Sequence, residues 1–115
     1  MLFVCYAKCT TCRKAEKWLA DNGFEYDKRD IKENAPRVEE LQEWHEKSGL
    51  PLRKMFNVSG QLYRSMNLKD KLKNMSDDEM LALLASDGML VKRPVLVCKD
   101  KVLVGFKEEE YAKLK

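Results

Sequence analysis

Two cysteines separated by two residues, Cys9 and Cys12, are the residues with the clearest chemical potential in this sequence. An apolar run precedes them and a segment with helical periodicity follows, so Cys9 is expected at or just before the start of a helix. Unpaired backbone N–H groups and the helix dipole favour a thiolate there, and Lys8 and Arg13 add positive charge nearby. The thiolate is the reactive form of cysteine. We therefore predict that Cys9 is a nucleophile and that Cys12 resolves mixed disulfides formed at Cys9, or closes a disulfide with it.

Two alternatives to a redox pair remain open, namely a zinc site and a coincidental pair. Zinc needs four ligands, and beyond the pair the sequence offers only Cys5, Cys98 and His45, with no second CxxC motif. Cys5 and Cys98 lie in apolar, strand-like runs, so we interpret both as unoxidised core residues. His45 is interpreted as a partly packed helix residue. We expect no bound metal.

The elements that position the pair follow from the apolar pattern. A continuous apolar run predicts a strand over 2–6, helical spacing from Cys12 predicts a helix that stops at Asn22-Gly23, and alternation predicts a second strand close to 24–30. These elements make a βαβ unit. Near the other end, apolar runs at 95–98 and 102–104 flank a short polar turn and predict a hairpin. A last short helix is expected within 107–114, where glutamates come first and lysines last.

The middle of the chain is expected to be helical throughout. An apolar stripe at helical spacing predicts a first helix that ends before Gly49. Residues 50–56 are expected to form another short helix and residues 57–60 a turn. Ser76 and Glu79 form a capping box for a helix that continues to Gly88.

Length and composition define the class of protein. A chain of 115 residues suits a single hydrophobic core, and with 44% hydrophobic residues it is too apolar to be intrinsically disordered. Its 22 basic and 19 acidic residues are interspersed, so there is no concentrated basic face for nucleic acid. No stretch approaches the ~20 apolar residues that span a bilayer, and the start lacks the basic region of a signal peptide. We expect a cytoplasmic protein without direct nucleic-acid or membrane partners.

Further motifs accompany the cysteine pair. They are Cys9-Thr10-Thr11-Cys12-Arg13-Lys14, Asn57-Val58-Ser59-Gly60, Tyr63-Arg64, Leu68-Lys69-Asp70, Arg93-Pro94-Val95 and Val104-Gly105-Phe106. In these motifs the chain resembles, over essentially its whole length, the arsenate reductase-like (ArsC) family that includes the Spx and MgsR regulators. The resemblance implies an α/β, thioredoxin-like (glutaredoxin-type) fold, with a mixed four-stranded sheet and a central all-helical insertion. We expect a single domain over 1–115, with its core in 1–34 and 89–115 and the helical insert in 35–88.

The resemblance also implies roles for individual residues. Arg93 would support the Cys9 thiolate, and Pro94 would be a cis-proline that faces the cysteines and offers backbone groups to substrate. The expected catalytic residues are Cys9, Cys12 and Arg93, and the expected substrate contacts are Lys8, Thr10, Thr11, Asn57 and Pro94. The family's reductases hold their oxyanion with three arginines. Here Arg93 matches one of them, Asn57 replaces another, and Phe106 or Lys107 stands in place of the third.

The function implied is that of a thiol–disulfide redox protein of the arsenate reductase family, an oxidoreductase without a bound cofactor. Its reductant would be glutathione with glutaredoxin, or thioredoxin, and its partner a small-molecule or protein thiol or disulfide. The alternative is a redox-sensing transcriptional regulator of the Spx and MgsR type, which would bind the C-terminal domain of the RNA polymerase α subunit. Pro51 stands near the position where those regulators carry a glycine used in that contact.

Overall fold

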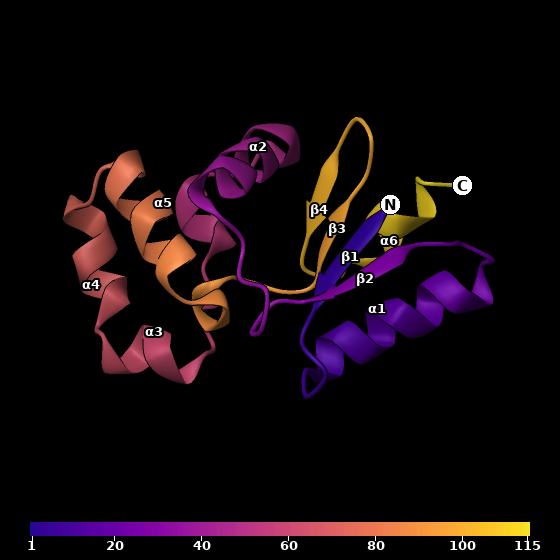
Figure 1. The fold of residues 1–115 in the computed structure, drawn as a ribbon, viewed down its shortest axis with the longest axis horizontal. Helices are drawn as coiled ribbons and strands as arrows, with labels where there is room; N and C mark the ends of the chain where they lie inside the picture. The colour runs from indigo at the N-terminus through magenta and orange to yellow at the C-terminus, as the bar shows by residue number, and fades with distance from the viewer.

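A computed structural model describes all 115 residues and places four strands in one mixed sheet, in the order β2-β1-β3-β4 (Figure 1). β1 (Leu2–Cys5) pairs in parallel with β2 (Asp27–Asp30) and antiparallel with β3 (Val95–Val97), which pairs antiparallel with β4 (Val102–Val104). A parallel pair needs a crossover connection, and α1 (Thr10–Asp21) provides it. The predicted βαβ unit, the hairpin and the mixed four-stranded sheet of a thioredoxin-like fold are confirmed.

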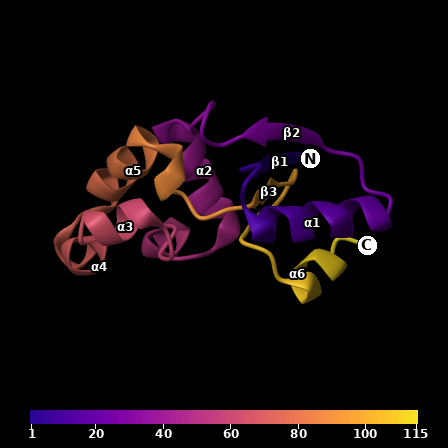
Figure 2. The ribbon, with the colours of Figure 1, turned by 90° about the horizontal axis from the view of Figure 1, so that it is seen from below.

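Each face of the sheet has its own core because side chains alternate along the strands. On one face Phe3 and Cys5 pack against α1 and against α6 (Glu108–Ala112), through Leu19 and Tyr111. Figure 2 shows α1 and α6 on the same side of the strands. On the other face Val4 belongs to the larger core that the helical segments complete. The cysteine helix therefore lies on the sheet face opposite the insert.

The segment between β2 and β3 contains only helices. They are α2 (Val38–Ser48), the 3-10 helix η1 (Leu52–Met55), α3 (Gln61–Ser65), α4 (Leu68–Lys71), η2 (Leu72–Asn74), α5 (Asp77–Ser86) and η3 (Gly88–Leu90). The predicted capping box begins α5, since Ser76 Oγ accepts from Glu79 N–H at 3.2 Å and Glu79 Oε1 accepts from Ser76 N–H at 3.1 Å. Figure 1 shows α3, α4 and α5 beside the sheet, at the far end from α1. The insert thus extends the molecule sideways.

Two elements differ from their sequence predictions. β2 begins at Asp27, because Asp27 pairs with Leu2 at the start of β1 and the preceding residues have no partner strand. Phe24 stacks instead on Trp18, with ring centroids 5.7 Å apart. Residues 50–56 form only a short 3-10 helix, since Phe56 leaves it in extended conformation to make an isolated β-bridge with Val91. No helix in the structure combines the length and apolar character needed to cross a bilayer.

Candidate functional site

Cys9 occupies the N-cap position of α1. Its backbone is extended, and its Sγ accepts a hydrogen bond from Cys12 N–H at 3.4 Å. A side-chain oxygen usually accepts this bond at an N-cap, so sulfur here takes the place of serine or aspartate. The half-buried Cys9 side chain also lies at the positive end of the helix dipole. The Cys9 sulfur thus lies where a backbone N–H group and the positive end of the dipole meet.

Cys12 lies one turn into α1 and is buried, with 3% of its surface exposed. Its Sγ accepts a hydrogen bond from Tyr6 N–H at 3.5 Å. Burial raises the pKa of Cys12 from 9.0 to about 12; the Tyr6 hydrogen bond opposes this rise, and the nearby Cys9 side chain adds to it. The two cysteines therefore differ: one is accessible at the helix start, and the other is a buried thiol that keeps its proton at neutral pH.

The raised pKa of Cys12 predicts a loss of stability in alkaline solution. In the unfolded chain this thiol ionises near pH 9.0, whereas in the folded protein it stays protonated to about pH 12. Its contribution to the free energy of unfolding is therefore complete below pH 9.0 and is lost as the pH rises towards 12. Burial also raises the pKa values of Tyr26 and Tyr111, so these two residues likewise lower the free energy of unfolding as the pH rises.

Urea unfolding of the reduced protein at about pH 8 and about pH 11 measures this loss. We expect wild type to lose about 2 kcal/mol more over this interval than Cys12→Ala, which keeps the contributions of Cys5, Cys98, Tyr26 and Tyr111, whose pKa values burial also raises. Equal losses in the two proteins would contradict the assignment.

Tyr6 connects Cys12 with Arg93. While its backbone N–H holds the Cys12 sulfur, its ring lies 5.3 Å from the Arg93 guanidinium carbon. Arg93 Nη1 donates to the carbonyl oxygens of Met89 at 3.3 Å and Val91 at 3.5 Å, and the buried Nε has no partner. The Arg93–Pro94 peptide bond is cis, as predicted. The Tyr6 ring thus supports the guanidinium group while its backbone N–H holds the Cys12 sulfur.

Removing the Tyr6 ring should slow the reaction of Cys9 with an anionic disulfide. We expect Tyr6→Leu to react about threefold to tenfold more slowly with Ellman's reagent, since a cation–π contact of this kind contributes ~0.5–2 kcal/mol to holding Arg93 in place. Tyr6→Phe keeps the ring and should react like wild type. Neutral dithiodipyridine serves as the control reagent, because it has no charge for Arg93 to attract. Equal rates for Tyr6→Leu and Tyr6→Phe with Ellman's reagent would contradict this role.

A cavity of about 360 Å³ opens beside Cys9. It brings together four of the predicted site residues, Cys9, Thr11, Asn57 and Arg93. Asn57 reaches it because its N–H donates to Leu90 O at 2.8 Å, which holds residues 57–60 against the segment that leads to Arg93. The other lining residues are Ser59, Gly60, Lys92, Val104, Gly105, Phe106 and Lys107. The cavity is therefore mainly polar and basic.

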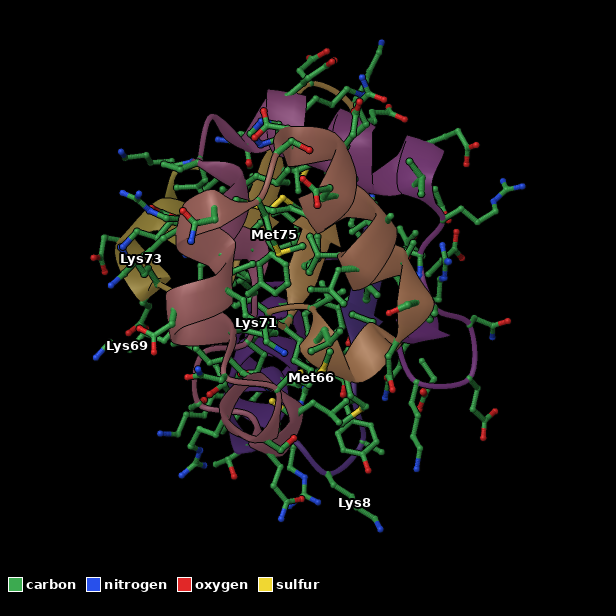
Figure 3. All side chains as sticks on the ribbon, turned by 90° about the vertical axis from the view of Figure 1, so that its left-hand side faces the viewer. Lys8, Met66, Lys69, Lys71, Lys73 and Met75 are labelled. Atoms are coloured by element: carbon green, nitrogen blue, oxygen red, sulfur yellow. The ribbon has the colours of Figure 1, made fainter.

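The remaining predicted contacts lie outside this cavity. Lys8 and Thr10 are exposed, Pro94 is buried, and none of the three lines the cavity. Figure 3 shows Lys8 extending outward from the protein. Sequence reasoning missed Lys92 as a lining residue, although it stands directly before the recognised Arg93-Pro94 motif. Phe106 and Lys107, one of which the resemblance places where the third arginine would stand, both line the cavity.

The other two cysteines lie apart from the cavity. Cys5 is buried in the sheet core with 4% exposed, as predicted, and Cys98 is half-buried against the same core. Burial raises the pKa of both thiols. His45 is partly packed on α2. No group of three or more His, Cys, Asp or Glu side chains is arranged to hold a metal ion.

Comparison with known proteins places the chain among relatives that match nearly its whole length. The uncharacterized Bacillus subtilis protein YusI is 55% identical over 111 residues, which cover 96% of this chain and 94% of that protein. Regulatory protein MgsR of Bacillus subtilis is 29% identical over 114 residues, covering 99% and 89%. A crystal structure described as a possible arsenate reductase from Streptococcus mutans superposes with a TM-score of 0.87 at 48% identity, and 96% of each chain is covered. The model of the ArsC family matches residues 5–114, and the chain belongs to that family.

Proposed function

We propose that the protein is a thiol–disulfide oxidoreductase whose Cys9 and Cys12 cycle between dithiol and disulfide. The observation that carries the proposal is the asymmetry of the pair. Cys9 lines an open cavity and accepts an N–H hydrogen bond at the start of α1, whereas Cys12 is buried with its pKa raised to about 12. An accessible sulfur at the N-terminus of a helix suits a nucleophile. A protonated thiol one helical turn away suits the resolving step that follows.

Each step of the proposed reaction forms one sulfur–sulfur bond and breaks another. The Cys9 thiolate attacks one sulfur of a substrate disulfide, forms a mixed disulfide and releases the other substrate sulfur as a thiolate. Cys12 then attacks the Cys9 sulfur and passes its proton to the substrate sulfur that is bonded to Cys9. That sulfur leaves as the second substrate thiol, and a Cys9–Cys12 disulfide remains. Two electrons have moved from the protein to the substrate. A dithiol such as thioredoxin, or glutathione with glutaredoxin, would return them.

The cavity favours a disulfide over a tetrahedral oxyanion such as arsenate. Arg93 is its only arginine, beside Asn57 and two lysines. Bidentate arginine contacts recognise a tetrahedral oxyanion well, and lysine acts only as a point charge. We therefore expect slow arsenate reduction, if a coupled assay detects any.

A single-turnover reaction tests the proposal. Reduced protein mixed with one equivalent of neutral dithiodipyridine should release two thiopyridones per chain as the Cys9–Cys12 disulfide closes. Release of only one thiopyridone, with a stable adduct on Cys9, would show that Cys12 does not resolve and would overturn the proposal. Modification of Cys98 instead of Cys9 would also overturn it.

A second candidate is a redox-sensing regulator, which the similarity to MgsR favours. In this reading the same disulfide controls binding to the C-terminal domain of the RNA polymerase α subunit. Binding assays with this domain, using reduced and oxidised protein, discriminate the two functions. Binding that changes with redox state supports the regulatory function. If neither the reduced nor the oxidised protein binds the domain, this candidate function is removed.

A further inference from the structure

A second groove continues from the cavity beside Cys9. Its volume is about 530 Å³, and it shares Lys92, Val104 and Lys107 with the site cavity. Its walls come from β4, from the segment after α2 and from α6. Figure 1 shows how these elements meet: β4 is the sheet strand beside α2, and α6 follows it in the chain. A chain entering this groove would therefore be led towards the Cys9 sulfur.

The groove is strongly basic. Its five lysines are Lys54, Lys92, Lys101, Lys107 and Lys113. None of them takes part in any ion pair of the structure, although Lys17, Lys28, Lys47 and Lys73 elsewhere do. Glu110 is the single carboxylate in the lining. The groove therefore has an excess of uncompensated positive charge.

Four of the remaining lining residues are apolar. They are Leu50 and Leu103, which are half-buried, and Val102 and Val104, which are buried. Lys101 is half-buried. A groove that combines cations with partly exposed apolar side chains complements an extended peptide that mixes acidic and apolar side chains. A small inorganic anion would use only one part of it.

We propose that this lysine groove binds an acidic, extended segment of a protein partner and so presents the partner's neighbouring disulfide to Cys9. The inference rests on the proposed function and names its substrate class. The chemical step is unchanged: Cys9 attacks the partner's sulfur, Cys12 resolves the mixed disulfide, and two partner thiols are released. The groove contributes by raising the rate at which acidic partners encounter the site.

Three matched peptides test the proposal. Each contains one cysteine activated as a mixed disulfide with thiopyridine, flanked by glutamates, glutamines or lysines at the same positions. Cys9 attacks the peptide sulfur, and the neutral thiopyridone released reports the rate. We expect the glutamate peptide to react about tenfold faster than the glutamine peptide at low salt, and the lysine peptide to react slowest. The preference should nearly vanish at about 1 M salt, where the Debye length is only ~3 Å and attraction between more distant charges is screened.

Charge-reversal variants locate the effect. Lys101→Glu/Lys113→Glu alters the groove alone, since neither residue lines the cavity beside Cys9. It should abolish the preference for glutamate. Lys69→Glu/Lys73→Glu makes the same charge change at the end of the insert, where Figure 3 shows both lysines, and should keep the preference.

The outcomes separate this inference from the proposed function. Equal rates of wild-type protein with all three peptides would overturn the groove assignment. A preference for glutamate that both double variants lose alike would also overturn it. Normal oxidation of the pair by neutral dithiodipyridine in those same samples would leave the proposed function standing. Failure of that small reagent to close the Cys9–Cys12 disulfide would instead overturn the proposed function, and the groove's role with it.

Discussion

Replacing Cys9 with serine is expected to lower the rate of disulfide reduction by about a thousandfold or more. The hydroxyl of serine is a poor nucleophile towards sulfur, but it can accept the N-cap hydrogen bond that Cys9 Sγ now accepts from Cys12 N–H. The helix should therefore remain intact while the reaction is lost. Cys12 cannot substitute, because it is buried and burial raises the pKa of its thiol, which keeps the proton at pH 7.

The matched control for Cys9→Ser is Cys98→Ser, which removes the other half-buried thiol. Cys98 does not line the cavity, so this variant should reduce disulfides at the wild-type rate. Thiopyridone release under single-turnover conditions measures both variants. Substantial activity in Cys9→Ser would contradict the assignment of the nucleophile.

Replacing Cys12 with alanine is expected to stop the reaction after its first step. Cys9 should still attack the substrate, but no second thiol is in place to release it, so the mixed disulfide accumulates to one equivalent per chain. Mass spectrometry of the intact protein should show the substrate thiol attached, and a reducing agent should remove it.

Cys5→Ala is the matched control for Cys12→Ala. Both cysteines are buried in the same core, with 4% and 3% of their surface exposed, so the packing losses are similar. Only Cys12→Ala should trap the adduct. If both variants released their second thiol normally, a residue other than Cys12 would be the resolving group.

Signals contained in short stretches of sequence sufficed for the elements around the cysteines. The apolar run before Cys9 and the helical spacing after Cys12 predicted β1 and α1, and the Ser76 and Glu79 capping box predicted the start of α5. In each of these cases the residues that determine the structure are neighbours along the chain.

Features that depend on distant segments were not predictable in this way. The shorter β2 reflects where β1 begins opposite Asp27. The approach of Asn57 to Arg93 depends on the hydrogen bonds from Asn57 N–H to Leu90 O and from Lys92 N–H to Met55 O, at 2.8 and 2.7 Å. The lysine groove is likewise built from separate segments of the chain, and each of its lysines read alone resembles an ordinary solvated surface residue.

Disulfide mapping at redox equilibrium tests the central claim most directly. The protein is equilibrated in mixtures of reduced and oxidised dithiothreitol, quenched with acid, alkylated and digested with trypsin. Cleavage after Lys8 and Arg13 releases the peptide 9–13, which contains both Cys9 and Cys12. We expect this peptide to convert, in a single two-electron transition, from a doubly alkylated form to an unalkylated form that contains the disulfide, while Cys5 and Cys98 remain alkylated. A peptide that stays doubly alkylated in every mixture, or a disulfide that joins Cys9 to Cys5 or Cys98, would contradict the proposed redox pair.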